Sequence, residues 1–413
     1  IVKEKAWLIL ILVVPLLFFH ELFFFSKIPF PGDVLVGDYE PYRSYSFLGY
    51  NPGSFPHKAQ GPDVIKQLIP WKKFSIESFK EKEVPLWNPY NFSGNPLMAN
   101  FQSAVFYPLN FIFFILPFKL AWSAYILLIP ILSLLFAYLY LRNLKLSNEA
   151  SFLGAVSFSF SLYMVVWLQW GNIGHTLLFL PLLLFLTDKL IEKIEFKLLA
   201  IFSGTLIFSI LAGYIQGFFY IFALILFYFL AKSWHLKKLS LKKTTFFLLG
   251  LAAPLFISMF QIFPTLELFA NSSRGNYSLE NIEKILNPAY YLITTAAPDF
   301  FGNPATRSFW FDGTYIERVS YFGLIPLLFA VFAILHFLKK IEIKIFTICF
   351  LMALFLSTDF LITKFFYLLP IPVISTTVPT RLLSIFAFSA SVLAAFGFDI
   401  FIANKSNKKL LAI

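Results

Sequence analysis

Long apolar runs, almost free of charged side chains, alternate with short polar stretches along the whole chain. The runs are about 15–22 residues long, and about 20 apolar residues in a helix cross the ~30 Å hydrocarbon core of a membrane. Strands of a membrane barrel would be shorter and would alternate apolar with polar side chains. The pattern therefore predicts an all-α membrane protein, a polytopic helical bundle of about ten transmembrane helices. The expected spans are 6–25, 120–141, 150–168, 172–188, 198–213, 215–231, 245–265, 319–338, 343–358 and 381–402.

The composition agrees with this pattern. Hydrophobic residues make up 59% of the 413 residues and charged residues only 13%, whereas a soluble domain is nearer half apolar and a quarter charged. The formal net charge is +11, but basic residues beside apolar spans are typical of membrane topology and of contacts with anionic lipid headgroups. We therefore expect membrane lipids as partners and no nucleic acid.

The positions of the basic residues predict the orientation. Basic stretches follow every second expected span, and short loops rich in Lys and Arg stay in the cytoplasm. Both termini of the chain are then cytoplasmic, and the chain is a multi-pass protein of the cell membrane. The stretches are "DKLIEKIEFK" (188–197), "KSWHLKKLSLKK" (232–243), "KKIEIK" (339–344) and "KSNKK" (405–409).

This orientation holds only if the apolar segment 104–118 does not cross the membrane. We expect a re-entrant or interfacial helix there, which is allowed at membrane depth when protein covers its backbone. Large extracytoplasmic loops are then predicted at 26–119 and 266–318, with a proline-rich outer hairpin at 359–380. The whole chain, 1–413, is interpreted as a single polytopic membrane domain.

Motifs typical of several classes of protein are absent from the sequence. The sequence has no GxxxxGK[ST], no GxGxxG and no HExxH, which argues against an ATPase, a Rossmann-type nucleotide-sugar enzyme and a zinc protease. The one cysteine, Cys349, lies in an apolar run, so there is no disulfide framework and no thiolate metal site. The chain begins at Ile1 and ends in "NKSNKKLLAI", and we expect a fragment whose C-terminal part is missing.

Residues 63–83, "DVIKQLIPWKKFSIESFKEKE", mix apolar side chains and lysines in a helix-compatible pattern. They predict an amphipathic helix that lies on the membrane surface. Asp63 stands at its start and Gln67 one turn later, and a carboxylate at a helix N-terminus is stabilised by the helix dipole. The segment is either an interface anchor alone or part of a functional site.

Two stretches of the first loop resemble the first outer loop of the bacterial YfhO-like membrane proteins. They are "GPDVIKQLIPWKKF" (61–74) and "VPLWNPYNFSGNPLMANFQSAVFYPLNFIF" (84–113). That loop has an Asp-x-x-x-Gln-x-x-Pro-aromatic segment, a Leu-Trp-Asn-Pro, a Gly-x-Pro turn and an aromatic Tyr-Pro before the next helix. The likeness continues in order over nearly the whole chain. The further similar stretches are "LAGYIQGFFY" (211–220), "QIFPTLELFANSSRG" (261–275), "PDFFGNP" (298–304), "YIERVSYFGLIPLLFA" (315–330) and "VPTRLLSIFAFS" (378–389).

The resemblance implies a glycosyltransferase of the GT-C type, which moves a sugar from a polyprenyl-phosphate carrier on the outer membrane face. The expected partners are a polyprenyl-phosphate-linked sugar and a cell-envelope acceptor, which is a polymer, a lipid or a protein. Longer relatives continue with more spans and an outer C-terminal domain, and these are not in this sequence.

Displacement at an anomeric carbon needs a carboxylate to deprotonate the acceptor hydroxyl, and positive charge or a metal to stabilise the departing phosphate. The resemblance implies that the base is an acid of the first outer loop, with Asp63 as the first candidate and Asp38 as the second. Arg274 and Arg381 are candidates for binding the phosphate, because a guanidinium binds it through two hydrogen bonds. Glu267 is expected to orient an arginine or to bind a divalent cation. Interface anchors and a structural salt bridge are the alternatives for these three residues.

Aromatic and amide side chains of the first loop complete the candidate site. Trp87 and Tyr107 are expected to stack on sugar faces, while Asn88 and Gln102 form hydrogen bonds with hydroxyl groups. Gln67 joins them through its place in the Asp-x-x-x-Gln element. The alternative for the rings is an aromatic belt at the membrane interface.

Two other classes of function stay open. The first is a lipid or oligosaccharide transporter or flippase, which would place ionisable groups near mid-membrane, often in inverted repeats. Here the expected spans are nearly free of charge and no repeat is evident. The second is a non-catalytic membrane scaffold, which would tolerate the loss of any one outer carboxylate.

Overall fold

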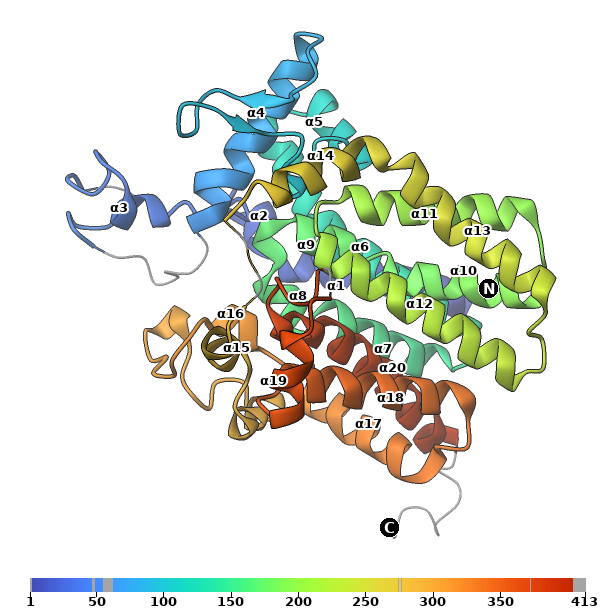
Figure 1. Ribbon diagram of the computed structural model, residues 1–413. Helices are drawn as coiled ribbons and strands as arrows, with labels where there is room; N and C mark the ends of the chain where they lie inside the picture. Colours follow the sequence, from blue (N-terminus) through green and yellow to red (C-terminus); the bar gives the residue numbers. More distant parts are fainter. Residues whose placement is uncertain are drawn as a thin grey trace.

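Apolar helices dominate the computed structural model of the protein (Figure 1). The regular structure of its described residues consists of twenty α-helices, one two-stranded hairpin and several short helical turns. The all-α fold expected from the hydropathy pattern is therefore confirmed. The structure describes residues 2–46, 49–54, 62–273, 275, 277–371 and 373–403.

Four segments of the described chain are long and apolar enough to cross a membrane. A fifth counts if α13 (Leu241–Ile257) and α14 (Met259–Ala270), which meet at an angle of 66°, form one broken span. These segments indicate a membrane protein, and the total of ten spans stays a prediction. The four segments are α6 (Phe118–Asn143), α9 with α10 (Asn172–Leu177 and Leu180–Glu192), α12 (Ile215–His235), and the turn Pro379–Leu382 with α20 (Leu383–Ala403).

The other helices are shorter, and three of them, α1, α11 and α17, are apolar in most of their length. The hairpin pairs β1 (Trp87–Asn88) with β2 (Asn95–Pro96) in antiparallel fashion. The shorter helices are α1 (Val2–Phe18), α2 (His20–Phe24), α3 (Val34–Asp38), α4 (Ile69–Lys80), α5 (Ile112–Ile115), α7 (Asn148–Ser159), α8 (Leu162–Val166), α11 (Phe196–Leu211), α15 (Leu279–Ile285), α16 (Tyr315–Arg318), α17 (Leu324–Phe337), α18 (Ile341–Ser357) and α19 (Leu361–Leu368).

Two expected spans are broken by local backbone chemistry. In the range 150–168, α7 ends at Ser159, and the Ser161 hydroxyl accepts a hydrogen bond from the Met164 backbone N–H and so caps a new helix;. In the range 245–265, α13 carries Pro254 in its last turn and ends before Ser258;. Apolar residues continue across both breaks, so the hydropathy pattern does not reveal them.

The segment 104–118 contains only short helical turns. They are the 3-10 turn Pro108–Phe111 and the four-residue helix α5. A helix of this length rises about 6 Å, so it is far too short to cross a membrane. The geometry agrees with the expectation that this segment does not cross.

The helix α20 lies between α7, α17 and α18 (Figure 1). Every residue of α20 from Leu383 to Gly397 is buried. Small residues allow the close contact, because a Cβ atom on Gly397 would lie only 2.0 Å from the carbonyl oxygen of Phe329 on α17. Small residues that let two helix backbones approach closely are common where helices associate in membranes.

The turns and loops separate toward two ends of the helices (Figure 1). The turns that follow α10, α12 and α17 lie at the end where the N-terminus lies, and these turns contain the basic stretches. The helices α3, α15 and α16 lie at the opposite end. The basic stretches therefore gather at one end of the helices, and which side of the membrane that end faces stays a prediction.

Helix α14 forms hydrogen bonds with the first loop. The side-chain amide of Gln261 donates a hydrogen bond to the carbonyl oxygen of Met98 (2.7 Å), and the Thr265 hydroxyl donates to that of Ala99 (2.9 Å). Both side chains are buried, so these bonds satisfy loop carbonyls that would otherwise lack a partner.

Candidate functional site

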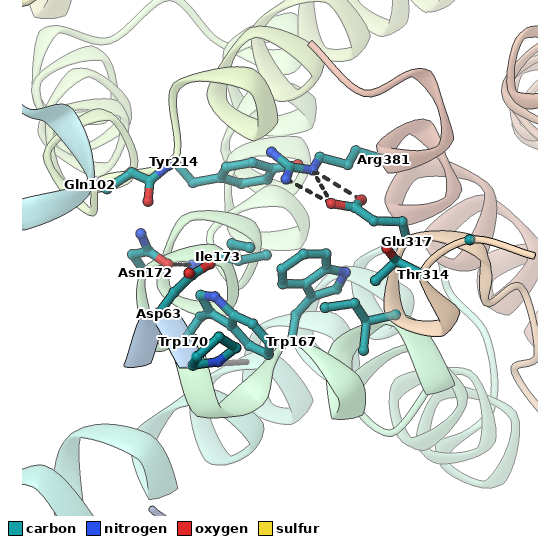
Figure 2. A pocket seen from close by; sticks show the side chains of 13 residues that line it. Asp63, Gln102, Trp167, Trp170, Asn172, Ile173, Tyr214, Thr314, Glu317 and Arg381 are labelled. Carbon is teal, nitrogen blue, oxygen red and sulfur yellow. Dashed lines mark hydrogen bonds and ion pairs between the residues drawn. The ribbon is translucent and has the colours of Figure 1, made fainter. Parts of the chain in front are cut away.

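A cavity of about 430 Å³ opens where the start of the amphipathic segment meets α16 and the beginning of the last long helix (Figure 2). Residues from widely separated parts of the sequence line it. Asp63, Gln102 and Asn172 lie on one side, and Glu317 and Arg381 lie on the other. Asp63, Gln102 and Arg381 are candidate site residues on sequence grounds, and the fold brings these three together.

Asp63 immediately precedes a helical turn at Val64–Leu68 that continues directly into α4. Its side chain is exposed, and it has no hydrogen-bond or ion-pair partner among the described residues. Its carboxylate therefore faces the cavity with no counter-charge from the described part of the chain, and it can accept a hydrogen bond from a ligand.

The backbone turn that follows α8 forms the aromatic wall of the cavity. Trp167 and Trp170 are almost wholly buried, and their ring centroids lie 4.8 Å apart. The chain then reverses at Gly171, whose φ is +72° and where a Cβ atom would lie 2.6 Å from the ring of Tyr125. Only glycine fits this position without a clash, so the glycine determines where both tryptophans lie.

Glu317 and Arg381 form a bidentate ion pair at the cavity wall (Figure 2). Nη2 of the arginine donates to Oε1 (2.8 Å) and Nε donates to Oε2 (3.1 Å). The two side chains are 23% and 18% exposed for the arginine and the glutamate. The guanidinium also lies 5.4 Å from the ring centroid of Trp167, and its Nη1 donates to Oε1 of Gln216 (3.4 Å). These contacts hold the cation in one place.

Polar side chains line much of the rest of the cavity. Asn172 is buried and donates from Nδ2 to the carbonyl oxygen of Gly213 (3.4 Å). Next to it, the Tyr214 hydroxyl lies 3.4 Å from that of Tyr163. The side chain of Gln102 is exposed toward the cavity (Figure 2). The wall thus presents amide and hydroxyl groups of the kind that form hydrogen bonds with sugar hydroxyls.

Several residues expected at the site lie elsewhere. Asp38, at the end of α3, is exposed and forms an ion pair with Lys66 (3.3 Å). Gln67 is partly buried in the turn before α4 and does not line the cavity. Glu267 is exposed on α14 and is not the residue that orients Arg381. Arg274 lies outside the described residues.

The aromatic residues of the first loop also lie away from the cavity. Trp87 is half exposed on β1 and covers Gly94, where a Cβ atom would lie 2.5 Å from its ring. Asn88 is buried and accepts a hydrogen bond from the Tyr90 backbone N–H (3.0 Å). Tyr107 is buried, and its hydroxyl lies 2.9 Å from Nδ1 of His175. In this structure these groups support the hairpin and the core.

A second polar cluster lies among the helices, near the turns at the basic end. Nζ of Lys232 on α12 lies 2.7 Å from Oδ1 of Asp188 on α10 and 3.1 Å from Oε1 of Glu342 on α18. The Tyr228 hydroxyl and the Asn143 amide also donate to Asp188, each at 2.9 Å. Lys232 and Glu342 lie just outside the expected spans 215–231 and 343–358, and Asp188 is the last residue of the span 172–188, so the cluster lies at the ends of the helices.

The described residues contain no group of three or more His, Cys, Asp and Glu side chains close enough to hold a metal ion. Comparison of the chain with family models, with curated proteins and with solved structures found no match. The cavity and the sequence motifs are therefore the basis of the function proposed below.

Proposed function

We propose that the chain is a membrane glycosyltransferase that moves a sugar from a polyprenyl-phosphate carrier to a cell-envelope acceptor on the outer face. The observation that carries the proposal is that one cavity is lined by both the carboxylate of Asp63 and the guanidinium of Arg381, which Glu317 holds in place. Sugar transfer needs a base for the acceptor and a positive charge for the leaving phosphate.

Asp63 is favoured over Asp38 as the base. Asp63 lines the cavity, whereas Asp38 lies outside it and is paired with Lys66. The pairing therefore supports a structural role for Asp38 within the first loop.

Arg381 is favoured as the phosphate-binding group. A guanidinium has five N–H donors, and the contacts with Glu317 and Gln216 use one N–H on each of its three nitrogens. The remaining N–H groups are free to donate to phosphate oxygens. Trp167 and Trp170 supply apolar surface on which a sugar ring can stack, and Gln102 and Asn172 supply polar groups for its hydroxyls.

The test is transfer by the purified chain in lipid vesicles, supplied with polyprenyl-phosphate carrying a labelled sugar and with envelope material as acceptor. A general base contributes roughly 10²–10⁴-fold to such a reaction, so Asp63→Asn should lower transfer by about that factor. Asparagine preserves the size of the side chain, so carrier binding should persist. The matched control is Asp38→Asn, which should change transfer by less than about tenfold.

Each result has a definite meaning. Normal transfer by Asp63→Asn together with loss of transfer in Asp38→Asn would move the base to Asp38. Full transfer by both variants would refute both acids as the base, whereas no transfer by the parent chain would refute the enzyme proposal and favour a scaffold.

One observation favours a second candidate, a lipid or oligosaccharide transporter. Buried ionisable groups among membrane helices are typical of transport pathways, and Asp188, Lys232 and Glu342 form such a group. Movement of a labelled carrier lipid between vesicle leaflets, abolished by Asp188→Asn and unaffected by Asp63→Asn, would support this candidate over the enzyme.

A further inference from the structure

A buried lysine lies beneath the first loop and takes no part in the chemistry proposed above. Lys72, on α4, is only 5% exposed, and no carboxylate is paired with it among the described residues. Its Nζ donates to Oδ1 of Asn110 (2.8 Å) and approaches the carbonyl oxygens of Ser103 (3.4 Å) and Ala104 (3.5 Å). A buried amine with only neutral acceptors is unusual, since buried lysines are usually paired with an acid.

The carbonyl groups that Lys72 contacts belong to the turn that carries Gln102. Phe101–Ser103 form one 3-10 turn, and Ala104 ends it in the left-handed conformation with φ of +48°. The turn packs tightly on Gly213, where a Cβ atom would lie 2.9 Å from Cβ of Ala104 and 3.0 Å from the carbonyl oxygen of Phe101. The position of the turn therefore sets the position of one cavity wall.

We propose that Lys72 is a positioning residue for the cavity, which holds the 101–104 turn against Gly213 so that the side chain of Gln102 lines the cavity beside Asn172 and Tyr214. The effect of this residue on sugar transfer rests on the proposed function, but its effect on the turn does not. Asn110 shares the task, because its Nδ2 donates to the carbonyl oxygen of Ala104 (2.7 Å).

The support that Lys72 gives depends on its charge. Burial lowers the pKa of Lys72 to about 7, so the amine changes from ammonium to neutral amine near neutral pH. An ammonium donates stronger hydrogen bonds to carbonyl oxygens than a neutral amine does. The turn is therefore held more firmly below pH 7 than above it.

The groups that face Lys72 from neighbouring elements do not replace this charge. The ring of Tyr125 on α6 lies 5.5 Å from Nζ, and the buried His175 on α9 contacts the same ring. Tyr107 donates to or accepts from His175 and also contacts Tyr125. The two tyrosines are neutral in their protonated form, and the neutral form of His175 is favoured because a second buried cation beside the ammonium would be repelled.

A cysteine reporter at Gln102 tests the proposal without any catalytic assay. The reporter is Gln102→Cys in a Cys349→Ser background, which removes the one native cysteine. Its reaction rate with a membrane-impermeant maleimide is measured from pH 6 to pH 9 and divided by that of Ser93→Cys, an exposed loop position. The division removes the intrinsic pH dependence of the thiol.

We expect the ratio to change about threefold to tenfold around pH 7, as one or two charge-assisted hydrogen bonds weaken. Lys72→Met, which keeps the length of the side chain, should give a ratio that does not depend on pH. Asn110→Asp places a carboxylate beside the amine, which favours the ammonium, and should move the midpoint above pH 8.

A ratio that is flat in the parent reporter, or that titrates unchanged in Lys72→Met, would overturn the proposal. If Lys72→Met does not fold, an unmoved midpoint in Asn110→Asp has the same meaning. A titration that depends on Lys72 in a protein that transfers no sugar would uphold this inference and refute the proposed function alone.

Discussion

Replacing Glu317 by Gln removes the charge that holds Arg381 but retains the shape of the side chain. The pair has two short N–H···O bonds, 2.8 and 3.1 Å, and the side chains are about four-fifths removed from solvent, at 18% and 23% exposed. Removing one partner of a fully buried ion pair costs about 3–5 kcal/mol. Because about a fifth of the surface stays in water, and because the rings of Trp167 and Tyr214 still face the cation, we expect a loss of about 2–3 kcal/mol.

The assay is unfolding by denaturant in detergent micelles, followed by tryptophan fluorescence. A double-mutant cycle with Arg381→Gln isolates the pair, and the double variant should be more stable than the sum of the single losses predicts by about 1–3 kcal/mol. Glu280→Gln is the matched control, since its pair with Lys284 is as short, 2.6 Å, but 76% and 67% exposed. That variant should unfold like the parent. Strictly additive losses at Glu317 and Arg381 would refute the reasoning.

Two further predictions test the arrangement of the helices. Cysteines placed at Ser93 and Ser308 should react with an impermeant reagent added outside intact cells, while one at Ser240 should not, because the basic turns are expected to be cytoplasmic; labelling at Ser240 from outside would contradict the orientation. Asp188→Asn leaves Lys232 buried with only Glu342 as a counter-charge among the described residues. The free energy of unfolding should therefore fall by about 1–3 kcal/mol, seen as a lower denaturant midpoint. A midpoint equal to that of the parent would show that the cluster contributes no stability.

The fold class and part of the cavity could be predicted from the sequence because each has a local signature. Apolar runs reveal the helices, and the Asp-x-x-x-Gln element singled out Asp63, which lines the cavity. Gln102 and Arg381 likewise lie in motifs that the sequence displays, and both line the cavity. Charged residues are only 13% of this chain, so few acids and arginines compete as candidates for the site.

The other residues of the cavity have no local signature. Glu317 looks like any loop acid until it meets Arg381, 64 positions later in the chain. Trp167 lies inside the expected span 150–168 and Trp170 in the short gap before the next span, so the hydropathy pattern predicts no cavity at either residue. Their position depends on the backbone reversal at Gly171, which is a matter of packing against Tyr125. Long-range contacts of this kind place the cavity residues that no sequence motif reveals.

The bond between α14 and the first loop has a consequence for how the chain is made. The carbonyl oxygens of Met98 and Ala99 accept hydrogen bonds from the side chains of Gln261 and Thr265, which are 163 and 166 positions later in the chain. At about 5–20 residues per second, the ribosome needs roughly 8–30 s to make that interval. During this time the loop has left the ribosome while its brace does not yet exist, so water or a chaperone must satisfy those two oxygens. The first loop, although among the first segments to emerge, reaches its final form only after α14 has been made.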